Sequence, residues 1–420
     1  MELKRVVVTG LGALTPIGHN VKTAWENALS GVSGAGPITQ FDASKFKTQF
    51  ACEVKDFDFS TLFDRKELRK VDRYTQLAIA ASEECISDSG LDFEKENRDR
   101  IGVIVSAGIG GIKTFESEVG SYFQHEELGP KFNPFFIPKM ISDIATGIIS
   151  IRHGLRGPNF GTVSACASST NSAISAFDLI RLGKADVIIT GGAEAAVCIS
   201  GIGGFNAMNA LSTRNDSPET ASRPFSASRD GFVLGEGAAC LVLEELEHAL
   251  ARGAKIYGEI AGGGMSADAY HLTASHPEGI GAKLVMKNAL ADAGMKPEDI
   301  DYINVHGTST PVGDPSEVKA IKEIFGEHAY KLNISSTKSM TGHLLGAAGA
   351  LEAMFSTLAV LNDIVPPTIN HEEGDDDPEI DYNLNFTFNK PQKREVRAAL
   401  SNTFGFGGHN ACVIIKKFKN

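Results

Sequence analysis

The chain has 420 residues, 42% of them hydrophobic and 22% charged, and a formal net charge of −12. This length suits two or three domains or one large duplicated unit, and the composition is that of a globular protein whose core needs neither disulfides nor metal. The negative balance argues against general nucleic-acid binding, which requires a basic face.

The N-terminus and the cysteines indicate the cellular setting. The apolar run 6–8 is interrupted by Thr9 and Gly10, and no cleavage-site pattern follows, so we expect no signal peptide. No uninterrupted apolar stretch approaches the roughly 18 residues of a membrane span, so we expect no membrane association. The six cysteines lie far apart without a C-x-x-C pair. This pattern predicts a reduced, cytoplasmic protein.

Short runs rich in β-branched residues alternate with segments of helical periodicity along the whole chain. The alternation predicts an α/β fold. The runs predicted as buried strands are 5–9, 101–106, 187–190, 240–244, 302–305, 398–400 and 411–415. The predicted helices include 74–89, 173–182, 280–293 and 317–325. The acidic run 372–377 is expected to be a surface loop.

Two parts of the chain resemble each other. Residues 232–243 align without gaps with residues 404–415, and residues 173–177 echo residues 350–354. The two offsets, 172 and 177, differ by an amount that loop insertions can absorb. This predicts two homologous halves, residues 1–256 and 257–420, related by a pseudo-twofold axis, with chance matches of small residues as the alternative.

Cys166 stands in a segment of small and polar residues, 164–170, that opens a predicted helix. The positive end of a helix dipole stabilises a thiolate, which is what a nucleophile for thioester exchange requires. A lone cysteine is more often a small core residue, and we expect that role for Cys198, Cys240 and Cys412.

Two histidines accompany this cysteine. His306 follows the predicted strand 302–305, at the carboxyl end where sites in α/β folds gather. His343 lies in a glycine-rich turn that opens the helix paired by the duplication with the helix of Cys166. Each histidine alone would more often be an ordinary core or surface residue. Together with Cys166 they form a candidate catalytic group.

The sequence supports neither a dinucleotide loop nor a zinc site. Gly10 and Gly12 follow a strand as in a dinucleotide loop, but Thr15 occupies the third glycine position. A zinc site on His306 and His343 would lack the usual closely spaced cysteine or histidine partners. The sequence therefore predicts no metal and no cofactor.

The sequence resembles the β-ketoacyl-[acyl-carrier-protein] synthases over essentially its whole length, most of all the type II elongation synthases of bacterial and plastid fatty-acid synthesis. The motifs that carry the resemblance are 7–12, 164–170, 211–216, 222–226, 229–237, 306–310, 338–349 and 402–410. The resemblance implies a thiolase-like five-layer αβαβα sandwich, usually in a homodimer, whose partner is an acyl carrier protein.

The resemblance also implies a mechanism. Cys166 accepts an acyl chain, and His306 and His343 stabilise the enolate formed when malonyl-carrier protein loses carbon dioxide. Backbone N–H groups of Cys166 and Phe406 form the oxyanion hole. The other positions it assigns are the supporting ionic residues Lys338 and Glu352, the pantetheine-binding Thr273, Thr308 and Thr310, the acyl-pocket residues Ile109 and Phe205, and the gate residues Phe404 and Phe406.

An acidic carrier protein needs a basic docking patch on this acidic chain. Arg65, Lys66, Arg69 and Lys70 are predicted to lie on one helix face, with a merely solvated face as the alternative. Asn209 stands where the bacterial elongation enzymes have an arginine, which leaves the docking footprint open.

Other functions remain open at this point. A non-catalytic chain-length partner of this fold lacks the nucleophile, whereas Cys166 and both histidines are present here. Thiolases and initiating synthases use one histidine or a second cysteine. A standalone polyketide ketosynthase shares the catalytic chemistry and is the main alternative.

Overall fold

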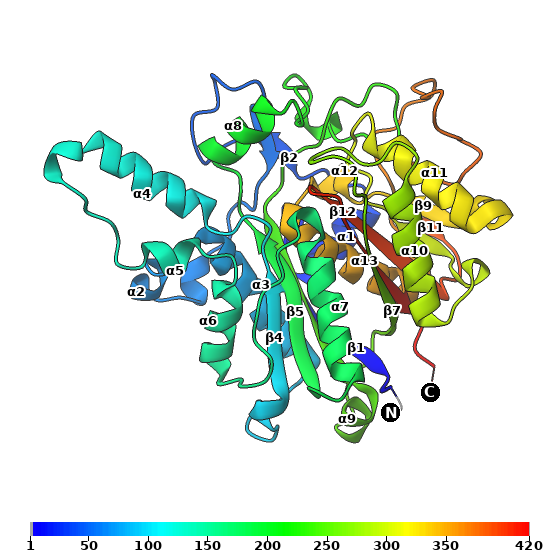
Figure 1. Cartoon of the computed structure of the whole chain (residues 1–420), viewed down its shortest axis with the longest axis horizontal. Helices are drawn as coiled ribbons and strands as arrows, with labels where there is room; N and C mark the ends of the chain where they lie inside the picture. Colours follow the sequence, from blue (N-terminus) through cyan, green and yellow to red (C-terminus); the bar gives the residue numbers. More distant parts are fainter. Residues whose placement is uncertain (1–2, 420) are drawn as a thin grey trace.

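The computed structural model describes residues 3–419, and one large β-sheet organises it (Figure 1). Nine strands are hydrogen-bonded in the order β4-β5-β6-β1-β7-β13-β12-β8-β9. On one side of the centre lie β4 (Ile101–Ser106), β5 (Val187–Glu194), β6 (Gly237–Glu245) and β1 (Val6–Leu14). On the other lie β7 (Gly258–Ala267), β13 (His409–Lys416), β12 (Ala398–Gly405), β8 (Tyr302–Asn304) and β9 (Asn333–Ser335).

The strand order repeats outward from the centre. β1, β6 and β5 are antiparallel neighbours and β5 is parallel to β4, while β7, β13 and β12 are antiparallel and β12 is parallel to β8. The two sets meet where β1 pairs with β7 over three residues. We propose that this repeat reflects duplicated halves, 1–256 and 257–420. Superposing the halves tests this, and a superposition that failed to align α7 with α13 would contradict it.

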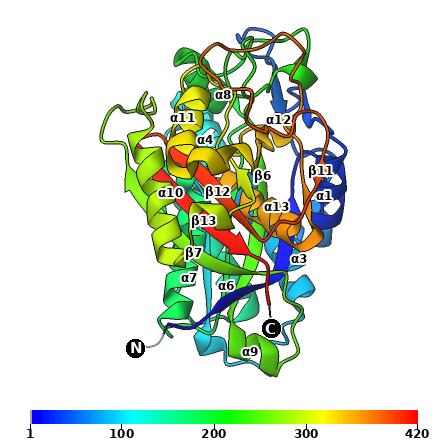
Figure 2. The same cartoon turned by 90° about the vertical axis from the view of Figure 1, so that its right-hand side faces the viewer.

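Helices complete five layers around the two parts of the sheet (Figures 1 and 2). α7 (Ser168–Arg181) and α13 (Ala348–Asn362) lie between the two parts and contact each other. α3 (Arg73–Ser89) and α6 (Ile144–His153) cover the outer face of the first part. α10 (Ile280–Ala293) covers the second, and α11 (Gly313–Phe325) packs against α10. The predicted αβαβα sandwich is confirmed.

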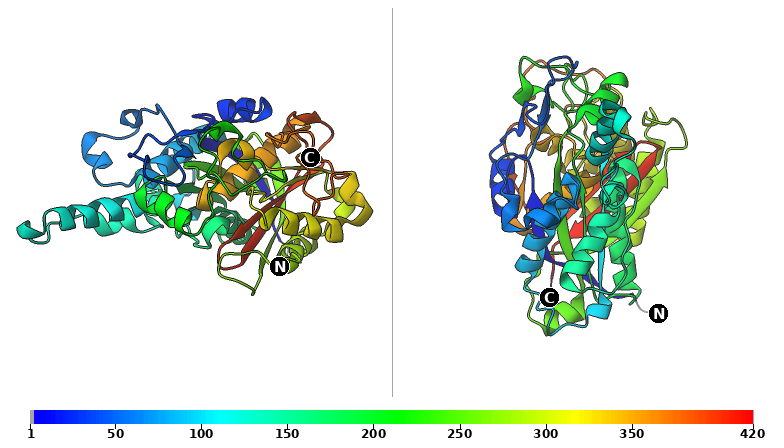
Figure 3. Two further views of the ribbon diagram at one scale, coloured as in Figure 1. Left: turned by 90° about the horizontal axis from the view of Figure 1, so that it is seen from above. Right: turned by 90° about the vertical axis from the view of Figure 1, so that its left-hand side faces the viewer.

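Smaller elements surround this core. They are α1 (Val21–Leu29), β2 (Ala35–Pro37), β3 (Phe50–Cys52), α2 (Arg65–Leu68), α4 (Ile112–Gln124), α5 (Phe136–Met140), α8 (Ile199–Ala207), α9 (Leu246–Ala251), α12 (Lys338–Thr341), β10 (Ile364–Val365) and β11 (Gln392–Lys393). α4 projects from the body, as Figure 3 shows from above.

Glycines near the N-terminus serve helix packing. A Cβ at Gly12 would lie 2.0 Å from the carbonyl oxygen of Ala81, and one at Gly10 would lie 2.4 Å from that of Cys85. Both contacts are far below van der Waals distance, so glycine is needed for α3 to approach β1 this closely. These glycines therefore have a structural reason that involves no nucleotide.

Helix α13 is long, apolar and almost wholly buried. The helical run Leu345–Asn362 has the length and hydropathy of a membrane span, but 89% of it is buried inside the protein. Its position between the two parts of the sheet accounts for this composition.

Two predicted features need refinement. β5 continues to Glu194, four residues beyond its predicted end, because Gly191 and Gly192 remain paired with β6. The acidic run 372–377 is largely a surface loop, but two of its carboxylates turn inward. Asp375 and Asp377 form ion pairs with the buried Arg223 and Arg229.

Candidate active site

Cys166 lies in a single 3-10 turn, η4 (Ala165–Ala167), that leads directly into α7. Ala165 has a φ of 51°, in the left-handed region that residues with a Cβ seldom adopt. The strand end at Gly405 packs against this turn, and a Cβ there would lie 3.1 Å from the Cys166 nitrogen. The turn thus places Cys166 at the start of α7, as predicted, and leaves space beside its N–H.

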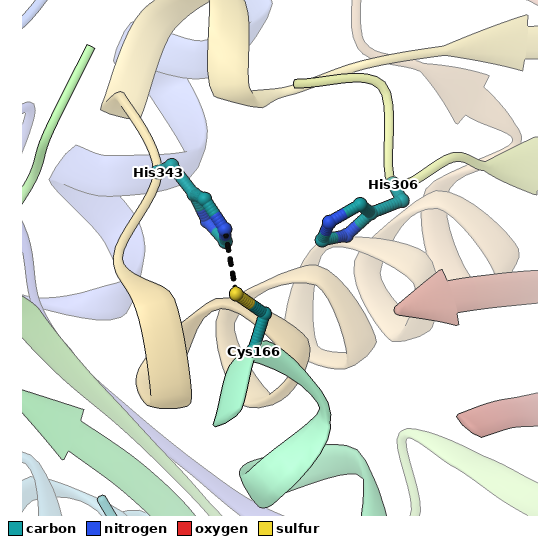
Figure 4. A group of neighbouring side chains, drawn as sticks. All are labelled: Cys166, His306 and His343. Atoms are coloured by element: carbon teal, nitrogen blue, oxygen red, sulfur yellow. Dashed lines mark hydrogen bonds between the residues drawn. The ribbon is translucent and has the colours of Figure 1, made fainter. Parts of the chain in front are cut away.

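Three side chains from separate elements converge at this point (Figure 4). His306 follows β8, and His343 lies between α12 and the 3-10 turn η8 (Leu345–Ala347). His343 Nε2 is 3.1 Å from Cys166 Sγ. The rings of His306 and His343 are nearly perpendicular, at 86°, with centroids 5.2 Å apart. The structure therefore brings together the three residues that the sequence proposed as a catalytic group.

Burial controls the protonation of these residues. It raises the pKa of Cys166 to about 12, although the charge of Lys338 and the N–H of Phe406 act in the opposite direction. Burial, with the charge of Lys338, holds the pKa of His306 and His343 well below the usual histidine value. At neutral pH the site holds a thiol and two neutral imidazoles, which differs from the helix-stabilised thiolate expected from the sequence. Desolvation inside the cavity outweighs the helix terminus.

Lys338 and Glu352 form an ion pair behind the histidines. Their side chains are hydrogen-bonded and only 2% and 3% exposed. Burial raises the pKa of Glu352 to about 7, and Lys338 opposes that shift. The pair holds the Lys338 ammonium in a fixed place near the site, and neither residue lines the cavity.

The three residues line a cavity of about 420 Å³. The same cavity is lined by all the residues predicted for acyl, pantetheine and gate functions, namely Ile109, Phe205, Thr273, Thr308, Thr310, Phe404 and Phe406. Sequence positions from 109 to 406 thus meet in one space. Which part of a substrate each one contacts stays a prediction.

The rim of the cavity contains the expected glycine-rich loop. Gly407 and Gly408 have φ values of 88° and 76°, a conformation that favours glycine. The Gly407 N–H donates to the carbonyl of Leu272, which joins this loop to the loop of Thr273. Phe406 is half-buried against Phe205, with ring centroids 6.4 Å apart.

Thr308 and Thr310 lie next to each other at the other side of the rim. Their hydroxyls are 3.1 Å apart. Arg229 fixes this segment, because its guanidinium donates to the carbonyls of Thr310 and Pro311. Thr273 is exposed on the opposite loop. The hydroxyls and backbone groups here can hydrogen-bond an amide-containing arm.

The basic segment around Arg65 differs from its predicted form. α2 is a single turn that ends at Leu68, so Arg69 is its C-cap and Lys70 follows it rather than extending one helix face. The helix does not continue, because the next residues form a turn in which the Lys70 N–H donates to the carbonyl of Glu67. Arg65, Lys66, Arg69 and Lys70 are all exposed, and none lines the cavity.

A different cation lies at the cavity rim. Lys47 Nζ donates to Asn209 Oδ1 at 3.1 Å, and Asn209 lines the cavity. Although position 209 has no arginine, the ammonium of Lys47 places a positive charge beside Asn209.

Sequence reasoning missed three residues of the site. Glu317 accepts the N–H groups of His306 and Gly307, and the ring of Phe232 packs edge-on against His343 at 5.3 Å. Glu194 binds backbone groups of the cavity wall. For Glu194 the available signal was an acidic residue inside the apolar segment 187–197, since such a residue is seldom buried without a partner. Glu317 and Phe232 had no such signal.

The site also has the ligand types of a metal centre. One atom each of Cys166, His306 and His343 lies within 4.8 Å of the others. Metal binding requires the thiolate, whereas burial favours the thiol here. That no metal is needed stays a prediction.

Comparisons with known proteins extend over the whole chain. The model of "Beta-ketoacyl synthase, N-terminal domain" matches residues 3–249, and that of "Beta-ketoacyl synthase, C-terminal domain" matches residues 257–372. The chain is 52% identical to 3-oxoacyl-[acyl-carrier-protein] synthase 2 of Staphylococcus aureus (strain COL), over 99% of both chains. It is 50% identical to the protein of that name from Coxiella burnetii, again over 99% of both.

Solved structures show the same similarity. A β-ketoacyl synthase from Burkholderia phymatum superposes with a TM-score of 0.91 at 33% identity, covering 99% of this chain and 100% of that one. A type II polyketide ketosynthase, solved in complex with its acyl-carrier protein, superposes with a TM-score of 0.89 at 31% identity over 99% and 100% of the two chains.

Proposed function

The chain belongs to the β-ketoacyl synthase family, and from this premise we propose that it is a 3-oxoacyl-[acyl-carrier-protein] synthase that elongates fatty acids by two carbons. The observation that carries the proposal is the contact of His343 Nε2 with Cys166 Sγ, beside His306 in one cavity. A nucleophile and two neutral imidazoles suit an acyl transfer followed by enolate formation.

The first step transfers the acyl chain. Cys166 Sγ attacks the thioester carbonyl of an acyl carrier protein, and the N–H groups of Cys166 and Phe406 stabilise the oxyanion. The bond to the pantetheine sulfur breaks, and that sulfur leaves with the proton of the cysteine thiol. Neutral His343 is placed to relay this proton.

The second step produces the carbon nucleophile. Malonyl-carrier protein binds with its pantetheine arm along Thr308 and Thr310, and its carboxylate leaves as carbon dioxide. The electron pair of the broken bond passes to the thioester as an enolate. Hydrogen bonds from His306 and His343 to the enolate oxygen lower the barrier, and Lys338 adds favourable charge.

The third step joins the two units. The enolate carbon attacks the carbonyl of acyl-Cys166, the carbon–sulfur bond breaks, and the Cys166 thiolate that leaves takes a proton from water. The product is a 3-oxoacyl chain on the carrier protein. The reaction is of the acyltransferase class, and the chain's own residues supply each of these roles without a cofactor.

Substitution of the nucleophile tests the proposal. Cys166→Ala should gain no acyl mass from acyl-carrier protein and form no product. Cys166→Gln should keep malonyl decarboxylation, because its uncharged amide resembles the acylated cysteine. Intact-protein mass spectrometry and carbon dioxide release measure the two effects. Cys198→Ala, at a second buried cysteine, is the matched control, and an acyl adduct that persisted on Cys166→Ala would refute the assignment.

A polyketide ketosynthase is the second candidate, because a polyketide enzyme superposes closely on this chain. The fatty-acid function is favoured by identity, which is 50–52% to the 3-oxoacyl synthases and 31% to the polyketide ketosynthase. The product decides between them. One condensation per acyl chain supports elongation, whereas repeated condensation without reduction would support the polyketide alternative. Cys166 itself argues against a non-catalytic chain-length partner.

We further propose that the carrier protein docks through exposed cations. Arg65 and Lys66 on α2 offer charge to an acidic partner, and Lys47 offers it at the rim of the cavity. Lys66→Glu and Lys47→Glu should each raise the KM for acyl-carrier protein, whereas Lys287→Glu on α10 should not. An unchanged KM in both variants would remove this docking surface.

Two properties of the whole protein are proposed on the same basis. All six cysteines are free and buried, which suits a reducing cytoplasm. A fluorescent fusion that concentrated outside the cytoplasm would contradict this location. The protein is also proposed to form a homodimer, for which the Discussion gives the surface and the test.

A further inference from the structure

Glu194 is a fully buried carboxylate at the end of β5, and its partners are backbone amides. It accepts the N–H groups of Gly108 at 2.8 Å, Gly110 at 3.1 Å and Gly346 at 3.1 Å, and that of Ile109 at 3.2 Å. Both carboxylate oxygens are used, one mainly by Ile109 and Gly110 and the other by Gly108 and Gly346. Both oxygens of this buried carboxyl group therefore have hydrogen-bond partners, as buried polar groups require.

These amides belong to two separate walls of the catalytic cavity. Gly108 and Ile109 follow β4 and line the cavity, and Ile109 is one of the predicted acyl-pocket residues. Gly346 lies in η8, directly after the segment of His343, and its neighbour Leu345 lines the cavity too. One carboxylate therefore joins the acyl-pocket wall to the segment that carries a histidine.

The proposed duplication accounts for the form of the turn that Glu194 binds. η8 begins at Leu345 with a φ of 47° and leads into α13, as η4 begins at Ala165 with a φ of 51° and leads into α7. Gly346 is the middle residue of η8, the place that Cys166 occupies in η4. The second half thus contains a turn of the same form without a nucleophile.

The strands that face the two turns differ in a matching way. Glu194 pairs with Gly237 and Gly405 pairs with His409, and these partners are equivalent positions of the repeat. Gly405 has no side chain beside the Cys166 N–H, which leaves that N–H for a substrate oxyanion. At the second turn the Glu194 carboxylate accepts the equivalent N–H, that of Gly346.

We infer that Glu194 is a positioning residue for condensation, an internal carboxyl group that fills the second turn and holds Ile109 in register with the His343 segment. The inference rests on the proposed function, because it concerns how that cavity receives an acyl chain. Without the carboxylate, buried N–H groups on both walls lose their acceptor. A long chain, which extends along the wall of Ile109, is then misplaced more than a short one.

Glu194→Gln tests this without a change of size. A glutamine offers one acceptor oxygen, so either the N–H groups of Ile109 and Gly110 or those of Gly108 and Gly346 lose their acceptor. Acylation of Cys166 by a long-chain acyl-carrier protein should slow by about tenfold or more, the scale of a misplaced substrate, while a butyryl chain changes by less than about threefold. Rates of adduct formation by mass spectrometry at graded chain lengths give the profile.

Chemical rescue supplies a second variant. Glu194→Gly removes the carboxylate and leaves a pocket lined by four N–H groups. Added acetate should restore long-chain acylation, whereas acetamide, its uncharged analogue, should not. If Glu194→Gly does not fold, the chain-length profile of Glu194→Gln decides alone.

Glu53→Gln is the matched control. Glu53 is also buried, and it accepts the N–H groups of Thr39 and Gln40, away from the cavity wall. It should lower thermal stability without altering the profile. Equal slowing of Glu194→Gln at every chain length, or loss of stability alone, would overturn the inference. A wild-type protein that performed no condensation would instead refute the proposed function.

Discussion

Cys166 lies at a helix start and buried inside the cavity, and the two settings act on its thiol in opposite directions. The helix terminus favours the thiolate, while burial favours the thiol and raises the pKa of Cys166 to about 12. The 3.1 Å contact with the neutral imidazole of His343 resolves this conflict. A thiol that can pass its proton to an adjacent base during attack needs no resting thiolate.

This protonation state predicts the pH dependence of alkylation. Because the pKa of Cys166 is raised, the thiol is protonated throughout the neutral range and the thiolate fraction increases with every step in pH. The rate of alkylation of Cys166 by iodoacetamide should therefore keep rising above pH 9. Mass spectrometry of the modified peptide measures it. A rate that reached a plateau near neutral pH would show a thiolate–imidazolium pair instead.

The two histidines should differ in how much they affect each half-reaction. His306→Ala and His343→Ala should both slow malonyl decarboxylation by about 100-fold or more, the scale for losing one oxyanion donor. Acylation of Cys166 should suffer less, and less in His306→Ala than in His343→Ala, because His343 is the histidine that is hydrogen-bonded to the sulfur. Carbon dioxide release and adduct formation separate the two. Equal losses in both half-reactions for both variants would indicate a structural role.

Among single residues, the sequence predicted the site residues that stand in a recognisable motif and missed the others. Cys166, His306 and His343 stand in distinctive segments, and the duplication placed two of them at equivalent helix starts. Glu194 and Glu317 bind backbone amides, an interaction that depends on where loops meet and leaves no spacing in the sequence. The protonation of Cys166 was also inaccessible, since burial inside the cavity is a tertiary property.

Among the elements, apolar periodicity located strands and helices well, and their ends poorly. The strand 101–106 and the helix 280–293 have the predicted bounds. β5 extends past its apolar run because Gly191 and Gly192 can still pair with β6. The helix expected around Arg65 is one turn, because charge spacing reports a face only if a helix continues.

At the scale of elements, we predict that Phe406 acts as the gate on the glycine-rich loop. The loop is a tight turn between β12 and β13, and the backbone hydrogen bonds of Gly407 to Leu272, Gly408 to Gly405 and Asp268 to Gly408 must break for it to swing. Phe406→Ala should slow long-chain acylation of Cys166 and loosen the order of substrate binding, with a modest fall in Tm. Stopped-flow loading at several chain lengths measures this.

Phe386→Ala is the comparison for the gate, because Phe386 is a buried ring that does not line the cavity. It should lower Tm more than Phe406→Ala does. Unchanged loading at all chain lengths in Phe406→Ala, together with a large loss of Tm, would identify Phe406 as a core residue.

Across the whole molecule, the two proposed halves supply different residues to one site. The first half provides Cys166 on η4, and the second provides His306 and His343 beside η8. Since α7 and α13 contact each other in the central layer, the starts of both helices open on one cavity. The layered fold therefore assembles the site from residues that are far apart in the sequence.

The last property of the whole molecule is an uncovered apolar region around α4, α5 and α6. Exposed large side chains of this region are Phe115, Phe123, Phe132, Ile137, Ile151 and Val163. The ring of Phe136 stacks on that of Phe132, with centroids 5.5 Å apart, and also on that of Phe115. These contacts connect α5 to α4. Ile151 and Val163, 80% and 63% exposed, extend the region to the edge of the sheet. Apolar surface of this kind is typical of a homodimer interface.

Association through this region should give a dimer of twice the 44.7 kDa chain mass in light scattering at micromolar concentration. A twofold axis brings each substituted residue into the interface twice, so Phe132→Glu and Val163→Asp should each weaken dimerisation by at least about tenfold, since one buried unpaired charge costs more than 1.4 kcal/mol. Leu250→Glu on α9 places the same kind of charge on an exposed apolar residue outside the region and should leave the dimer intact. A monomeric wild-type protein, or dimers that tolerate both charges, would show that this surface has another occupant.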